Sequence, residues 1–138
     1  MPNENPCELE IPNDFLHAKE VEDRIVEQAA HCGFSEEQTF AIRLCLEEAL
    51  SNAIRHGNGG DPTKKIRICY AVSNEKTEIT IADQGTGFNP TAVPDPTVRE
   101  NLETPSGRGI MLMKAYMNSV EYNKLGNQVR LVKLNKAG

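Results

Sequence analysis

An acid and an amide lie four residues apart near the middle of the chain, at Glu48 and Asn52. If this segment is helical, four residues make about one turn and leave about 40° between the two side chains, so both can contact one ligand. Asn52 offers a neutral carbonyl oxygen suited to Mg²⁺, and Glu48 can accept a proton from an attacking hydroxyl during phosphoryl transfer. Neighbouring acids are more often a solvated helix face. We expect that role for Glu47, which lies about 140° from Asn52.

A glycine turn follows at residues 83–87, with the sequence Asp83-Gln84-Gly85-Thr86-Gly87. Taken alone, this motif is most simply an ordinary hairpin turn. However, a carboxylate at the end of a buried strand can accept a hydrogen bond from the exocyclic amine of adenine, which guanine lacks, and glycines let the backbone approach base and ribose. The turn therefore predicts an adenine site at Asp83, with Gly85 and Gly87 beside it.

A second glycine pair, Gly107 and Gly109, stands at the start of a predicted helix. The free amides and positive end of a helix N-terminus stabilise phosphate without a net basic charge. Ser106 and Arg108 can add donors. Such loops are common before helices, but the order of the three motifs predicts a pocket for ATP and Mg²⁺.

Apolar periodicity predicts the elements that must position these residues. We expect an edge strand, a helix from Asn13 or Asp14 to about Cys32, and a second helix of about 22 residues that is capped by Ser35. Two hairpins and a further helix should follow, at 66–72 with 79–81, at 120–125 with 129–134, and at 109–118. Alternation places Asp83 on the buried face of its strand. The four prolines between 88 and 106 suggest a lid loop.

Composition limits the class of protein. The 138 residues suit one domain, 1–138, and the net charge of −5, 5% aromatic content and absence of Trp argue against nucleic-acid binding. No leader and no long apolar run is visible, so we expect a cytoplasmic protein that does not span a membrane. The four scattered cysteines are expected to be reduced thiols.

Three segments, residues 48–57, 83–88 and 106–113, resemble the three motifs of the gyrase, chaperone, histidine-kinase and mismatch-repair ATPase superfamily (GHKL). Within that superfamily, the chain is most similar to the small anti-sigma-factor serine kinases of bacterial partner-switching systems. The resemblance implies an α+β Bergerat fold, a two-layer α/β sandwich with helices on one face of a mixed, mostly antiparallel sheet. It also implies that the family's base and metal residues fall on Glu48 and Asn52, and its adenine residue on Asp83.

The resemblance further implies the partners. Members of this family bind a sigma factor and phosphorylate a serine or threonine of a small antagonist, here expected to be of the STAS-domain type, and they form homodimers. The alternative is a nucleotide-binding partner-switching module without kinase activity. It stays open because Pro105 replaces a basic residue, and Asn127 and Gln128 replace threonines. A detached histidine-kinase catalytic domain is a third possibility, but only one helix precedes the expected pocket.

Overall fold

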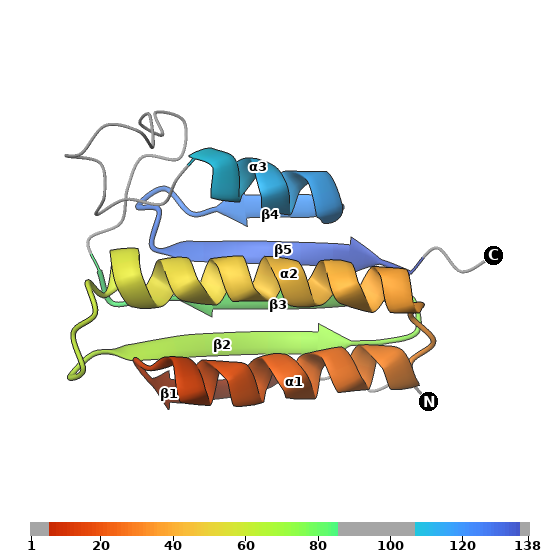
Figure 1. Ribbon diagram of the computed structural model, residues 1–138, viewed down its shortest axis with the longest axis horizontal. Helices are drawn as coiled ribbons and strands as arrows, with labels where there is room; N and C mark the ends of the chain where they lie inside the picture. The colour runs from red at the N-terminus through yellow and green to blue at the C-terminus, as the bar shows by residue number, and fades with distance from the viewer. Residues whose placement is uncertain (1–5, 86–106, 136–138) are drawn as a thin grey trace.

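The computed structural model describes residues 6–85 and 107–135, with residues 107 and 108 described by their backbone only. In this part of the chain, three helices lie over one face of a five-stranded sheet with the order β1-β2-β3-β5-β4 (Figure 1). The elements are β1 (Cys7–Pro12), α1 (Phe15–His31), α2 (Glu36–Asn52), η1 (Ala53–Gly57), β2 (Lys65–Val72), β3 (Lys76–Ala82), α3 (Gly107–Tyr116), β4 (Ser119–Tyr122) and β5 (Gln128–Leu134).

The helices begin where the capping signals predict. The side chain of Asp14 accepts a hydrogen bond from the backbone N–H of His17 at 2.8 Å and caps α1. Ser35 and Gln38 form a reciprocal capping box at the start of α2. None of the helices among the described residues has the length and hydropathy that a membrane span needs.

The core lies between the helices and one face of the sheet. Alternate residues of β2 and β3, such as Ile68 and Ile79, are fully buried beneath α1 and α2. All four strand pairings are antiparallel, so the described sheet lacks the parallel pair that a mixed sheet would contain. The predicted α+β fold is confirmed, and the predicted lid at 88–106 lies outside the described residues.

The end of α2 departs from the prediction of one regular helix up to residue 57. Regular α-helix ends at Asn52, and the next five residues form the π-helical turn η1, closed by the hydrogen bond from Asn58 N to Ala53 O at 2.8 Å. Gly59 and Gly60 follow with positive φ angles of 61° and 70°. The wider turn carries Gly57 toward the end of β3, and π-turns of this kind occur frequently at functional sites.

One carboxylate is buried between α1 and α2. Glu22 is only 2% exposed, and its Oε2 accepts from Arg43 Nη1 at 2.6 Å and from Lys19 Nζ at 3.1 Å. Burial raises the pKa of Glu22, whereas the two cations oppose that change. The ionised form of Glu22 therefore depends on these partners.

Arg43→Ala should lower the free energy of unfolding by about 2 kcal/mol, because it removes a charged hydrogen bond from a buried carboxylate. Urea unfolding followed by circular dichroism measures this effect. Asp23→Ala is the matched control, because Asp23 bonds the same guanidinium at 2.8 Å but is about half exposed. If Arg43→Ala lowers the free energy of unfolding no more than Asp23→Ala does, the buried Glu22 carboxylate does not depend on Arg43.

Candidate functional site

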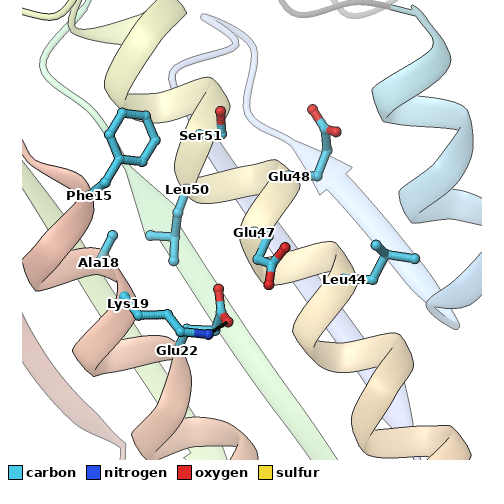
Figure 2. Close-up of a pocket in the computed structure, with 9 residues that line it drawn as sticks. All are labelled: Phe15, Ala18, Lys19, Glu22, Leu44, Glu47, Glu48, Leu50 and Ser51. Carbon is cyan, nitrogen blue, oxygen red and sulfur yellow. Dashed lines mark hydrogen bonds and ion pairs between the residues drawn. The ribbon is translucent and has the colours of Figure 1, made fainter.

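The two polar residues of α2 lie where helical geometry places them. Glu48 is half-buried and points toward α3, whereas Glu47 is exposed and faces α1 (Figure 2). Asn52 is 9% exposed, and its Nδ2 has no acceptor among the described residues. A buried amide nitrogen without an acceptor is an exception in folded proteins, so Asn52 Nδ2, which has none among the described residues, is available to a ligand.

The N-terminus of α3 meets Glu48 directly. A Cβ atom on Gly109 would lie only 2.6 Å from Glu48 Oε2 and 2.9 Å from its Cδ, so any other residue here would displace the Glu48 carboxylate from this position. The helix begins at Gly107, as the second glycine motif predicts. The candidate general base therefore lies beside the positive end of a helix, where anions are stabilised.

Asp83 lies in a cradle formed by two glycines. A Cβ on Gly57 would overlap the Asp83 carboxylate, and a Cβ on Gly85 would overlap the carbonyl oxygen of Gly57. Asp83 Oδ1 accepts a hydrogen bond from Gly85 N at 2.8 Å. Burial raises the pKa of Asp83, opposed by this hydrogen bond and by the charge of Lys64. The turn is thus held close to the end of α2, with the Asp83 carboxylate desolvated.

Asn58 anchors the same turn and was missed by the sequence analysis. It is 2% exposed, and its Oδ1 accepts from Gln84 N at 2.7 Å. Its Nδ2 donates to Lys65 O and to Asn13 Oδ1, each at 3.0 Å. Only its place in a glycine-rich turn hinted at this role, because asparagine is common in solvated turns as well.

Tyr122, at the end of β4, is a second residue that the sequence analysis missed. It is half-buried on the side of the sheet that the helices cover, opposite Val129 of β5. Burial raises the pKa of Tyr122, and the charges of Glu48 and Asp83 raise it further. The phenol therefore lies close enough to both carboxylates to respond to them. Its position in a short alternating strand gave no sign of this proximity.

A groove of about 480 Å³ lies between α1 and α2 (Figure 2). Phe15, Ala18 and Lys19 line it from α1. Residues of α2 from 44 to 51, including Glu47 and Glu48, line it from the other side. Glu48 therefore belongs to the lining of this groove, whereas Asp83, Gly57 and Gly85 do not.

Some residues of the predicted site lie outside the part of the chain that the structure describes. Gly87 and Ser106 are outside the described residues, and so is the side chain of Arg108. Within the described part, the structure brings Glu48 to Gly109, and Asp83 and Gly85 to the turn that follows Asn52. Their roles toward a ligand remain predictions.

Comparison with known proteins agrees with this arrangement. A family model described as the histidine kinase-like ATPase domain matches residues 11–133. The chain belongs to this ATPase family. A protein of Mycobacterium tuberculosis whose crystal structure holds RsbU and RsbW domains has the same fold, with a TM-score of 0.64, 14% identity, and coverage of 97% of this chain and 34% of that one.

Curated relatives define the branch of the ATPase family. The anti-sigma F factor of Bacillus cytotoxicus is 32% identical over 103 residues, which cover 70% of each chain. The serine/threonine-protein kinase BtrW of Bordetella bronchiseptica is 28% identical over 87 residues, or 62% of this chain and 61% of BtrW. The serine-protein kinase RsbW of Oceanobacillus iheyensis is 29% identical over 101 residues, or 69% of this chain and 64% of RsbW. The chain is therefore a member of the anti-sigma-factor kinase family and spans under two thirds of the last two relatives.

Asp83→Asn should weaken ATP binding at least tenfold and stabilise the chain without nucleotide. Because the folded-state pKa of Asp83 is raised above 3.8, ionisation at neutral pH opposes folding, and that cost disappears as pH falls through the raised pKa. Asparagine has nearly the same size and shape as aspartate but carries no charge, so the substitution removes this cost. Thermal unfolding with and without ATP measures both effects.

The control is Asp61→Asn. Hydrogen bonds from Thr63 lower the pKa of Asp61, so its ionised form supports folding above 3.8. This variant should be slightly less stable and should bind ATP normally. A destabilised Asp83→Asn chain would contradict the sign of the pKa argument.

Gly57→Ala should weaken ATP binding about tenfold, because the new methyl group displaces the Asp83 carboxylate, and it should cost about 1–3 kcal/mol of stability. Gly59→Ala is the control. No atom lies within 4 Å of a Cβ at Gly59, but its φ of 61° makes alanine strained by about 1–2 kcal/mol. Titration with a fluorescent nucleotide should give a lower ATP affinity for Gly57→Ala than for Gly59→Ala. Equal ATP affinities of the two variants would contradict a role of the Gly57 cradle in ATP binding.

Proposed function

We propose that the chain is an ATP-dependent protein serine/threonine kinase and anti-sigma regulatory factor of the bacterial cytoplasm. In this proposal, it phosphorylates a small anti-sigma-factor antagonist of the STAS-domain type and sequesters a sigma factor. It acts as a single ATP-binding domain, as a homodimer, with a lid at 88–106. The contact between Glu48 and the start of α3 carries the proposal, because it brings a proton acceptor to a phosphate-binding helix end.

The cradle around Asp83 suits the adenosine part of ATP. Asp83 Oδ1 is engaged by Gly85 N, which leaves Oδ2 to accept from the exocyclic amine of adenine. Gly85 and Gly87 would hold the ribose. Residues 106–109 would hold the phosphates, because the backbone amides at the start of α3 would offset part of the phosphate charge.

Asn52 fits a magnesium ion that is bound together with phosphates. Its carboxamide is buried, its Oδ1 is the kind of neutral oxygen that Mg²⁺ accepts, and its Nδ2, which has no acceptor among the described residues, could donate to a phosphate oxygen. Across residues 6–85 and 107–135, no group of three or more His, Cys, Asp or Glu side chains could hold a metal. A cation at Asn52 Oδ1 would take its other ligands from ATP and water, and it would neutralise phosphate charge.

In the transfer step, the hydroxyl oxygen of the acceptor serine attacks the γ-phosphorus. Its proton passes to a carboxylate oxygen of Glu48, the bond from the γ-phosphorus to the bridging oxygen breaks, and ADP leaves. The groove between α1 and α2 is the candidate site for the protein acceptor, because Glu48 helps to line it and Asp83 does not.

Glu48→Gln should lower phosphate transfer about 10²- to 10⁴-fold and leave ATP affinity within about twofold, because the amide keeps the shape but cannot accept the proton. The assay uses labelled ATP, magnesium and the STAS-domain proteins encoded near the gene. Glu37→Gln, on an exposed residue in the first turn of α2 that does not line the groove, should transfer phosphate normally.

Three outcomes separate the candidate functions. Transfer by the wild type that Glu48→Gln abolishes supports the kinase with Glu48 as base. Full transfer by Glu48→Gln removes Glu48 from the mechanism. ATP binding without transfer to any of these proteins favours the partner-switching module that lacks kinase activity.

A further inference from the structure

The turn that carries Asp83 is held from a second side by the hairpin between β4 and β5. Asp83 N donates to the backbone carbonyl of Asn127 at 2.9 Å. The side chain of the same residue returns to the turn, with Asn127 Nδ2 donating to Gly85 O at 3.2 Å. Asn127 therefore bonds the residues at both ends of the segment 83–85.

The carboxamide of Asn127 is fixed by a neighbouring asparagine. Asn123 Nδ2 donates to Asn127 Oδ1 at 2.8 Å. Asn123 Oδ1 accepts from Gly126 N at 2.7 Å and from Asn127 N at 3.1 Å, which closes the turn around Gly126 with its φ of 77°. The side chain of Asn123 therefore closes this turn, and the Nδ2 of Asn127 remains free to donate to Gly85 O.

The bond to Gly85 bears on the orientation of Asp83. The N–H of Gly85 donates to Asp83 Oδ1, while the C=O of Gly85 accepts from Asn127. Holding the carbonyl restricts residue 85 and thereby keeps its amide aimed at Oδ1. With Oδ1 engaged, Oδ2 lies at the position that a Cβ on Gly57 would fill. Asn127 thus acts on the carboxylate through one intervening residue.

We propose that Asn127 is a positioning residue that orients Asp83 for the selection of adenine over guanine. The proposal rests on the proposed binding of ATP and adds a determinant of base selectivity from the β4–β5 hairpin. Asn58 holds the middle of the segment through Gln84 N, and Asn127 holds its two ends. A carboxylate held in this way presents one acceptor oxygen in a fixed direction. This oxygen can accept a hydrogen bond from the amine of adenine, but it repels the carbonyl oxygen that guanine carries at the same position.

The test compares affinities for ATP and GTP in the full chain, measured by competition against a fluorescent ATP analogue. In Asn127→Ala, the affinity for ATP should fall about three- to tenfold, as expected for one lost hydrogen bond, with less than twofold change for GTP. Asn127→Asp has nearly the same shape and keeps the acceptor for Asn123, but it replaces the donor to Gly85 O by a charged carboxylate oxygen that repels this carbonyl. It should lose ATP selectivity at least as strongly.

Gln128→Ala is the matched control, because Gln128 is the next residue but is exposed and pairs with Ala82. Its ATP-to-GTP affinity ratio should equal that of the wild type. A general loss of structure would weaken both nucleotides together, so an unchanged ratio in both Asn127 variants overturns the positioning role. A wild-type chain that does not bind ATP overturns the proposed function, and this inference with it.

Discussion

The structure of the site depends on the close approach of the Asp83 carboxylate to the backbone of Gly57. This approach joins the end of β3 to the turn after α2, two segments that neither β-pairing nor regular helix would bring together. It requires glycine at two positions, and it requires the π-helical turn, which moves Gly57 out of the path of a regular helix. This contact thereby fixes the end of α2 relative to the end of β3 at the site.

The buried carboxylate of Glu22 and the half-buried carboxylate of Asp83 illustrate different uses of the same chemistry. Burial raises the pKa of both Glu22 and Asp83. Glu22 is compensated by the cations of Arg43 and Lys19, so it contributes to the packing of α1 against α2. Asp83 receives a single backbone amide from Gly85 and retains an oxygen for another partner. The difference in compensation separates a structural acid from one suited to a ligand.

Local patterns in the sequence were sufficient for the fold class and for most of the elements, whereas the roles of the site residues remain predictions. Capping signals located the starts of α1 and α2, and alternation placed Asp83 at the buried face. The hydrogen bonds that local patterns could not predict join distant segments. Asn58 bonds Asn13 across 45 positions, and Asn127 bonds Gly85 across 42. Periodicity reports which side of an element is buried, but it carries no information about which distant carbonyl an amide will reach.

The two outer strands of the sheet have a consequence for association between copies of the chain. In the described residues, the sheet ends at β1, which carries Glu8 and Glu10 and closes with Pro12, and at the four-residue β4, which carries Glu121. Acidic side chains, a proline and a short strand all discourage the addition of a further strand at an edge. Both edge strands therefore disfavour the pairing of copies into a continuous sheet, and with it fibrillar aggregation.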